Sequence, residues 1–350
     1  MPILALSDIK KENTRKVLDA IARKIHISKL EISEETGLSL MTVGKIVNSL
    51  GSCGLITRSK DLSPKAGRHA ELFRIRHDWL IPVFEIASHV YKFYITDLEG
   101  NVVEKLEYDC TREGKKAYAA EFLDFLHLTL DVLRKKYKHH KALGIGVSVS
   151  GIYDSENDKI VSSMKPELSG IKLMTNISKI FRQKNVVIDN ANRLCAEGII
   201  NGSRDYRNKT ITCITVSDYI EATTCQNGVY IKGAHNVAGR LGDLPFTPAL
   251  TYANFLRNAQ IARDTFSPIL DLIKFSCVAY DPDMIFLCTD KFCFTPDFTK
   301  RLNDSLKTGM LWVDKPPEIH TVNTSTIESL SGIISRVISN WLDKYIVKSE

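Results

Sequence analysis

The sequence lacks the features that define several classes of protein. No apolar run approaches the roughly 18 residues of a membrane-spanning helix, so no membrane span is expected. The N-terminal stretch MPILALSDIKKENT has too short an apolar part for a secretory signal peptide. The 8 cysteines are scattered without a CxC or CxxC pair, which suggests neither a zinc ribbon nor a disulfide framework. These absences predict a protein of the reducing cytoplasm, with no metal centre.

Positive charge is concentrated in the first part of the chain. The 350 residues carry 47 Lys and Arg against 41 Asp and Glu, a net charge of +6. Residues 1–78 contain 14 of the basic and 9 of the acidic residues, a net charge of +5 that leaves +1 for the other 272 residues. A small basic module beside a nearly neutral body is typical of binding to a polyanion. An ordinary solvated surface is the alternative interpretation.

The basic module has the pattern of a helix-turn-helix. Apolar residues at helical spacing predict a helix over about residues 8–24. Ser28 and Glu31 form a capping-box pattern that begins a short second helix, and Gly37 allows the turn that ends it. Ser39 then caps a third helix, whose predicted buried stripe is Val43, Ile46, Val47 and Leu50.

A basic wing is expected after the third helix. Residues 54–58 and 71–75 indicate two strands, and the loop between them carries Lys60, Lys65 and Arg68. Helices, wing and positive charge together favour DNA binding. A helical hairpin that contacts another protein is the alternative.

The third helix and the wing supply the candidate DNA contacts. Thr42, Lys45 and Asn48 can contact base edges or nearby phosphates, and Leu40 and Met41 can pack on thymine methyl groups. The wing cations would position the protein without reading sequence. The predicted DNA-binding residues are Ser39, Leu40, Met41, Thr42, Lys45, Asn48, Arg58, Lys60, Lys65 and Arg68.

The rest of the chain repeats one order of elements. Residues 82–150 indicate three strands, a helix and a glycine-punctuated buried strand. A second set of three strands begins near Thr210, with Asn227 and Gly228 as a hairpin turn. Helical residues 252–279 and a final amphipathic helix at about 326–344 follow, separated by further strands. This approximate duplication predicts a two-lobed, actin-like body of the sugar-kinase type.

The predicted fold class is α/β, with an N-terminal winged helix-turn-helix followed by a two-lobed, ribonuclease H-like body. We expect the DNA-binding domain over residues 1–78, the first lobe over 79–190 and the second lobe over 191–325. The C-terminal helix, 326–346, is expected to return to the first lobe.

Five segments spread over nearly the whole chain match the motifs of one protein family. They are TGLSLMTVGKIVNSLGSCGLI in the winged helix, KAGRHAELFRI at its junction with the body, and GIGVSVSGIYD, DNAN and NGVYIKGAHNVAGRLGD in the body. These segments resemble the ROK family of repressors, open reading frames and sugar kinases, whose body has a GIGV-x-x-x-G strand, an NDAN motif and a segment that ends in AGEIGH. The resemblance implies the transcriptional-regulator branch of the family.

The residues that would perform kinase chemistry depart from that resemblance. Asn190 stands where family kinases have the Asp that accepts the sugar proton, and an amide cannot do so near neutral pH. Asp189 could substitute only if its loop were displaced. The family's glycine-rich phosphate turns are replaced by EIASH at residues 85–89 and SDYIEAT at 217–223, where Tyr219 and Glu221 obstruct a phosphate. Neither a catalytic residue nor a nucleotide cofactor is therefore expected.

The sugar and zinc positions implied by the resemblance are also changed. Arg240 and Asp243 replace the Glu and His of AGEIGH, Glu167 stands where the family has a sugar-contacting Asn, and the CxCGxxGC zinc loop is absent. Arg240 suits a carboxylate or phosphate, so the effector can be a sugar, a sugar acid or a sugar phosphate. Pairing of Arg240 with Glu167, Asp189 or Asp243 in a closed cleft is the alternative. The candidate effector-binding residues are Glu167, Asp189, Asn190, Arg240 and Asp243.

The sequence thus predicts a cytoplasmic bacterial transcriptional regulator without enzyme activity. It would bind double-stranded operator DNA as a homodimer or larger homo-oligomer, with repression more usual than activation in such families. Effector binding would change the spacing of the DNA-reading helices. Two alternatives remain: a divergent sugar kinase with an appended DNA-binding domain, and a regulator whose body binds a protein partner.

Overall fold

The computed structural model describes most of the chain. The described residues are 6–24, 26–60, 71–87, 90–111, 114–163, 166–206, 208–217, 220–258, 265–289, 293–309, 315–323 and 326–345. The chain divides into two units. Unit 1 comprises Met1–Val147, Lys172–Ile188 and Ile334–Glu350, and unit 2 comprises Ser148–Ile171 and Asp189–Ile333.

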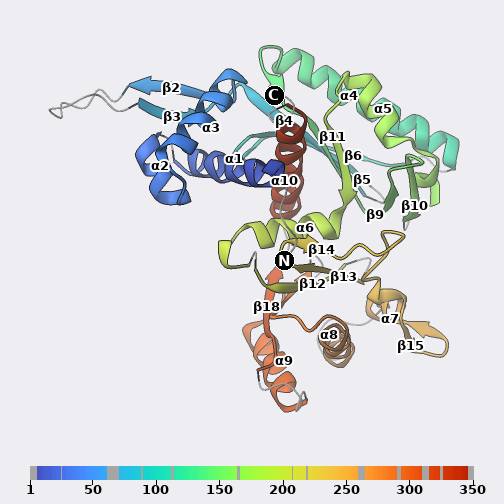
Figure 1. Ribbon diagram of the computed structural model, residues 1–350. Helices are drawn as coiled ribbons and strands as arrows, with labels where there is room; N and C mark the ends of the chain where they lie inside the picture. The colour runs from blue at the N-terminus through green and yellow to red at the C-terminus, as the bar shows by residue number, and fades with distance from the viewer. Residues whose placement is uncertain are drawn as a thin grey trace. The chain divides into compact units, whose positions relative to one another are not determined.

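Unit 1 begins with a winged helix (Figure 1). Three helices pack with a three-stranded antiparallel sheet in the order β1-β3-β2. The elements are α1 Leu6–Ala22, β1 Ile27–Ser28, α2 Lys29–Thr36, α3 Leu40–Ser52, β2 Ile56–Lys60 and β3 Glu71–Ile75. The predicted helix-turn-helix and wing strands are confirmed, and β2 continues two residues further than predicted.

Local side-chain chemistry explains where α2 begins and ends. The Ser28 hydroxyl accepts a hydrogen bond from the Glu31 N–H, while the Glu31 carboxylate accepts one from the Ser28 N–H. Without these bonds, both backbone N–H groups would lack an acceptor at the start of the helix. Gly37 has φ +70°, a left-handed conformation that glycine adopts at low cost. The sequence therefore fixes the turn between α2 and α3.

The remainder of unit 1 is built on a six-stranded sheet in the order β11-β8-β4-β5-β6, with the short β7 beside β4. The strands β4, β5 and β6 form an antiparallel meander. The elements are β4 Trp79–Ile86, β5 Val90–Asp97, β6 Val102–Asp109, α4 Lys115–Lys136, β7 Lys141–Ala142, β8 Ile145–Val149, α5 Leu173–Phe181 and β11 Val186–Asn190.

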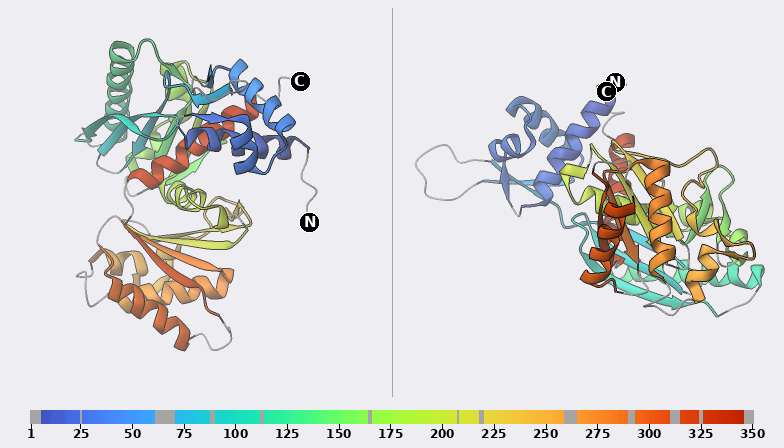
Figure 2. Two further views of the ribbon diagram at one scale, coloured as in Figure 1. Left: turned by 90° about the vertical axis from the view of Figure 1, so that its left-hand side faces the viewer. Right: turned by 90° about the horizontal axis from the view of Figure 1, so that it is seen from below.

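Alternation along β4 places helices on both faces of this sheet. The centroid of the Phe84 ring lies 5.9 Å from the ring centroid of Phe125 in α4 and 5.5 Å from that of Phe181 in α5. Trp79 lies an odd number of residues before Phe84, so its side chain points to the opposite face of the sheet. Its ring centroid lies 6.3 Å from that of Trp341 in α10 (Thr326–Tyr345). Figure 2 shows α10 across the sheet from α4.

Unit 2 contains a five-stranded sheet in the order β14-β13-β12-β17-β18. The first three strands again form an antiparallel meander, and β17 and β18 add in parallel. Each large sheet therefore has the strand order 3-2-1-4-5 when its five main strands are numbered along the chain and the short β7 of unit 1 is left out. The elements are β9 Gly151–Asp154, β10 Lys159–Ser163, α6 Ala191–Asn201, β12 Thr210–Val216, β13 Ile220–Gln226, β14 Val229–Tyr230, β15 Pro245–Thr247, β16 Leu250–Thr251, α7 Tyr252–Asn258, α8 Phe266–Tyr280, β17 Met284–Thr289, α9 Pro296–Gly309 and β18 Glu318–Asn323.

Two hydrophobic clusters cover the faces of this second sheet. Ile214 and Leu287 belong to a cluster with residues of α8 and α9, whereas Cys213 and Phe286 belong to a cluster with α6. Neighbouring residues of a strand point to opposite faces, so one strand supplies both cores. Figure 2 shows α8 and α9 on one side of the sheet and α6 on the other. The predicted α/β class is confirmed, and the three-strand meander followed by further strands recurs in both sheets, as the predicted repeat of elements implies.

Several elements were not predicted from the sequence. Among them are α5, α6, α9, the short strands β1, β7, β15 and β16, and the β9–β10 hairpin. Of the residues whose burial the structure describes in α9, only Leu302 and Leu306 are buried, so its apolar stripe is too narrow to stand out. The hairpin of β9 and β10 has a register shift between Ile160 and Ser162, which breaks the alternation that identifies strands.

Asn185 anchors the C-terminal helix to the sheet of unit 1. Its amide nitrogen donates to the carbonyl oxygens of Leu143 at 3.0 Å and Val337 at 3.1 Å, and its side-chain oxygen accepts from Asn340 at 2.8 Å. Gly144 allows this approach, because a Cβ there would lie 2.7 Å from the Asn185 carbonyl oxygen. The same helix contacts the winged helix: Lys11 Nζ lies 2.7 Å from Asp343, and Arg15 bonds to Ser335.

We expect Asn185→Ala to destabilise unit 1 by about 2 kcal/mol or more, because two buried carbonyl oxygens lose their donor. Asn101→Ala, which removes an exposed asparagine of the same unit, should change the free energy of unfolding by about 0.5 kcal/mol or less. Hydrogen exchange of β8 and α10, with thermal melting, measures the difference. Equal protection in the two variants would show that Asn185 does not anchor α10.

Candidate DNA-binding face and polar pocket

One face of α3 is exposed while the other is buried in the winged helix. Val43, Val47 and Leu50 are fully buried, whereas Leu40 is 52% and Met41 72% exposed. Lys45 and Asn48 are also exposed. The opposite face is fixed by the core, so these side chains are available to a ligand of the helix.

Two of the predicted DNA-binding residues hold the start of α3. The Ser39 hydroxyl accepts from the Thr42 N–H at 3.2 Å and lies 2.9 Å from the Thr42 hydroxyl. This N-cap leaves the first turn of α3 with its exposed apolar pair, Leu40 and Met41, in a defined position.

The structure brings together two other predicted contacts, Asn48 and Arg58. A guanidinium N–H of Arg58 donates to Asn48 Oδ1 at 2.8 Å. A second guanidinium nitrogen of Arg58 lies 3.4 Å from a carboxylate oxygen of Glu71. Lys65 and Arg68 lie outside the described residues, as does the side chain of Lys60. The wing-loop contacts therefore remain predictions.

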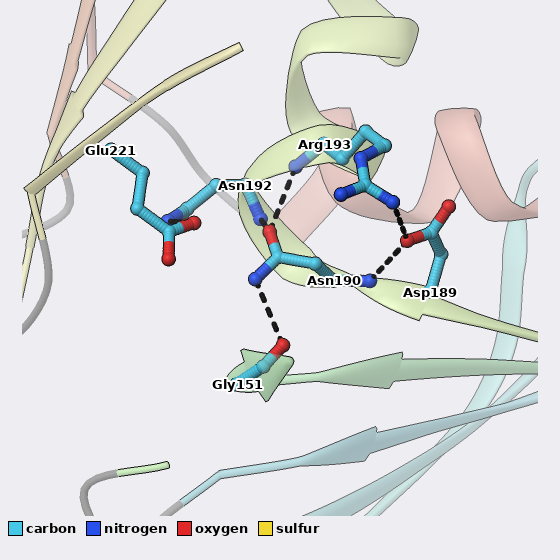
Figure 3. A network of polar contacts seen from close by, with 6 residues as sticks. All are labelled: Gly151, Asp189, Asn190, Asn192, Arg193 and Glu221. Atoms are coloured by element: carbon cyan, nitrogen blue, oxygen red, sulfur yellow. Dashed lines mark hydrogen bonds and ion pairs between the residues drawn. The ribbon is translucent and has the colours of Figure 1, made fainter. Parts of the chain in front are cut away.

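In unit 2, Asn190 joins the end of β11 to the start of α6 (Figure 3). Its Oδ1 accepts from the N–H groups of Asn192 at 2.9 Å and Arg193 at 3.1 Å. Its Nδ2 donates to the carbonyl oxygen of Gly151 in β9 at 3.0 Å. An Asp at this position could accept the first two bonds but could not donate the third. The amide is thus suited to a structural junction.

Asp189 is held by a buried ion pair. Its Oδ1 lies 2.6 Å from a guanidinium nitrogen of Arg193 and accepts from the Asn190 N–H at 2.7 Å. The two side chains are only 9% and 11% exposed. Burial lowers the pKa of Arg193, while the charges of Glu221 and Glu197 act to raise it. The Asp189 carboxylate is therefore committed to Arg193 in this structure.

The other charged groups nearby are also paired. Asn192 donates to Glu221 at 2.9 Å, and Arg240 donates to both carboxylate oxygens of Asp243, at 2.5 and 3.3 Å. Asp243, one of the candidate partners considered for Arg240, thus lies against it in the structure. Glu167 lies in a short 3-10 turn, Pro166–Gly170.

Several of these groups line a small polar pocket within unit 2. The pocket encloses about 20 Å³, which is room for about one water molecule. Asp189, Asn190 and Arg240 line it, but Glu167 and Asp243 are not among its lining residues. Further lining residues are Ile152, Tyr153, Arg193, Glu221, Ala222, Thr223, Ile231, Asn236, Val237 and Ala238.

Arg193 and Glu221 belong to the pocket but were not predicted as site residues. The spacing of Arg193, four residues after Asp189, could have indicated the ion pair, because α6 begins between them. Glu221 was considered only as an obstacle to phosphate. Its contact with Asn192 crosses 29 residues of sequence, and no local pattern reveals it.

Within the described ranges, no group of three or more His, Cys, Asp or Glu side chains is arranged to hold a metal ion. No helix among those residues is long and apolar enough to cross a membrane.

Comparison with known proteins gives two family matches. Residues 10–57 match the winged helix-turn-helix DNA-binding family, and residues 84–256 match the ROK family. The first match covers most of α1, all of α2 and α3 and the start of β2, and the second includes the polar pocket.

The similar curated proteins are repressors. The chain is 23% identical over 247 residues to the xylose repressor of Bacillus spizizenii, with 70% of this chain and 63% of that protein covered. It is 26% identical to the xylose repressor of Staphylococcus xylosus, with 67% and 60% covered. The match therefore spans less than two-thirds of the length of these relatives.

Solved structures share the fold. A ROK family transcriptional regulator, a homologue of the E. coli MLC protein, has a TM-score of 0.70 at 16% identity, covering 97% of this chain and 99% of that one. A ROK family protein from Streptococcus pneumoniae in complex with sucrose has a TM-score of 0.59 at 16% identity, covering 76% and 98%. The chain carries a ROK family domain behind an N-terminal winged helix-turn-helix DNA-binding domain.

Proposed function

We propose that this protein is a transcriptional repressor that binds operator DNA through its winged helix. The observation that carries the proposal is the exposed face of α3, where Met41, Lys45 and Asn48 project from a helix whose other face is buried. The net charge of +5 on residues 1–78 supports binding to a polyanion. The similarity to xylose repressors supports the same function.

The proposed binding unit is residues 1–78 of a homodimer, with two copies of α3 on two half-sites. In this proposal residues 79–190 and 191–325 form two lobes, and the final helix returns to the first lobe. The two lobes serve dimerisation and sensing.

The ROK domain is proposed to have no kinase activity. The side chain at the position of the general base is the Asn190 amide, and both of its polar atoms already bond to the chain. Asp189 is paired with Arg193, so it is a poor substitute as a proton acceptor. Glu221 places a carboxylate on β13, where the family resemblance expects a phosphate-binding turn.

The polar pocket is proposed to bind a neutral sugar as effector. Its two guanidinium groups are each neutralised by a carboxylate, which favours a ligand with hydroxyl groups over an anion. The repressors similar to this chain are named for xylose. Because the pocket now holds only about 20 Å³, a sugar ring requires its lining side chains to open.

Lys45→Ala is expected to weaken operator binding about tenfold, because an exposed cation of α3 is lost near bases or phosphates. Fluorescence anisotropy with the selected operator measures the affinity. Lys307→Ala removes an exposed lysine from α9 and should leave the affinity unchanged. If the two variants bound as tightly as the wild type, α3 would not be the DNA-binding helix.

Incubation with ATP and xylose or glucose is expected to release no ADP above the rate without protein, because no free carboxylate stands at position 190. Asn190→Asp should not create activity, since it also loses the hydrogen bond to Gly151. A coupled ADP assay tests both proteins. Clear turnover in the wild type that Asn190→Ala abolishes would establish a kinase.

Thermal melting should distinguish the effector classes, because a ligand of the folded state raises the midpoint. We expect a neutral pentose or hexose at low millimolar concentration to raise it, and the corresponding sugar acid or sugar phosphate to have no effect. Glu221→Gln should reduce the shift, whereas the exposed Glu318→Gln should retain it. No shift with any sugar would indicate a pocket closed by its own ion pairs.

A further inference from the structure

The side-chain oxygen of Asn236 is a buried acceptor in the wall of the polar pocket. Asn236 lines the pocket, and its Oδ1 has no hydrogen-bond partner in the part of the chain that the structure describes. The two arginines of the pocket differ from it, because Arg193 is paired with Asp189 and Arg240 with Asp243. A buried acceptor without a partner is unfavourable, since folding removes its bond to water and nothing replaces it. The Asn236 oxygen is therefore open to a donor from outside the chain.

The backbone of Asn236 adopts a conformation that few residues with a side chain tolerate. Its φ angle is +62°, in the left-handed region where asparagine is enriched. The Asn236 N–H donates to the carbonyl oxygen of Gly233 at 3.4 Å, and the Ala238 N–H donates to that of Lys232 at 3.2 Å. These backbone bonds close the turn, and the amide oxygen of the Asn236 side chain takes no part in them.

The segment that carries Asn236 is anchored to β13 at Gly239. The Gly239 carbonyl oxygen accepts from the Ala222 N–H at 2.7 Å. A Cβ on Gly239 would clash with the carbonyl oxygen of Ala222, and the φ angle of Gly239 is +89°, so glycine is required at this contact. Ala222 itself lines the pocket. The anchor therefore holds the Asn236 turn, three residues away, beside the pocket.

The same segment forms an exposed wall of the pocket. Ile231 and Val237 line the pocket and are 40% and 41% exposed, whereas Ala222 in β13 is only 4% exposed. Sites for small molecules commonly combine apolar walls with a few placed polar groups. A ligand that opens this wall would cover the two apolar side chains and meet the Asn236 amide.

We infer that Asn236 is a recognition residue for the effector, and that its side-chain oxygen accepts a hydrogen bond from a hydroxyl group of the ligand. A hydroxyl group can donate this bond, whereas a carboxylate or a fully ionised phosphate has only acceptors. The ligand class is therefore a neutral compound with several hydroxyl groups, such as a monosaccharide. This inference rests on the proposed function of the pocket as an effector site, and it names the atom that selects the ligand.

Titration calorimetry of the full chain with D-xylose and D-glucose tests the inference. Asn236→Gly removes the amide and keeps a residue that adopts a positive φ angle freely. It should weaken binding of the sugar that the wild type binds better about tenfold, the usual effect of losing one hydrogen bond. Asn227→Gly is the matched control, because Asn227 is an exposed asparagine with φ +51° between β13 and β14, and this variant should bind as the wild type does.

Monodeoxy analogues of the same sugar identify the bond itself. In the wild type, the analogue that lacks the hydroxyl bound to Asn236 should bind about tenfold more weakly than the parent sugar. In Asn236→Gly, this analogue and the parent sugar should bind equally, because the protein partner of that hydroxyl has been removed. Thermal melting without sugar should give Asn236→Gly a midpoint no lower than that of the wild type, because the variant loses a buried acceptor that lacks a partner.

Three results would contradict the inference in distinguishable ways. If Asn236→Gly bound the parent sugar as tightly as the wild type, Asn236 would be only a turn residue, and the pocket would remain the effector site. A lower melting midpoint without sugar would show that the amide stabilises the fold, and the inference would fail on that ground. If neither sugar bound to the wild type, the proposed effector site would fail together with the inference, while operator binding through α3 would be unaffected.

Discussion

The side-chain amide of Asn190 is the contact on which the polar site of unit 2 depends. It caps α6 through its oxygen and donates to β9 through its nitrogen, so that β11, α6 and β9 meet at one group (Figure 3). Asp189 and Arg193 lie on either side of it in the chain, and their buried ion pair forms only because α6 begins at this point. A single amide therefore sets the geometry of this side of the pocket.

The charged side chains that line the pocket are also paired. Each cation that lines it faces a carboxylate, and Glu221 accepts from Asn192. A charge buried without a partner would be costly, and the Asp189–Arg193 pair avoids that cost inside the nearly closed pocket, whereas Asp243, the partner of Arg240, is 62% exposed. A ligand whose hydroxyl groups take over these contacts can open the pocket and still leave each buried charge with a polar partner. This is the physical basis for proposing a neutral effector.

Much of the fold could be predicted because it follows from local patterns. The capping box at Ser28, the turn at Gly37 and the apolar stripe of α3 each act within one or two turns of helix. The antiparallel meanders combine apolar strands with strong turns, such as Asn227 and Gly228 with positive φ angles. The elements that escaped prediction have weak patterns: α9 buries few apolar residues, and the start of α6 is marked by Asn190, whose position suggested chemistry before capping.

The sequence by itself determined the order of the main strands, the basic N-terminal module and the presence of an amide at position 190, because these depend on residue identity and short spacing. Only the tertiary structure decided which polar groups meet. Arg58 lies ten residues from Asn48 and thirteen from Glu71 and contacts both across α3, β2 and β3, and Arg240 pairs with Asp243. Charged side chains are long and can choose among many partners, and distance and burial in the folded chain decide between them.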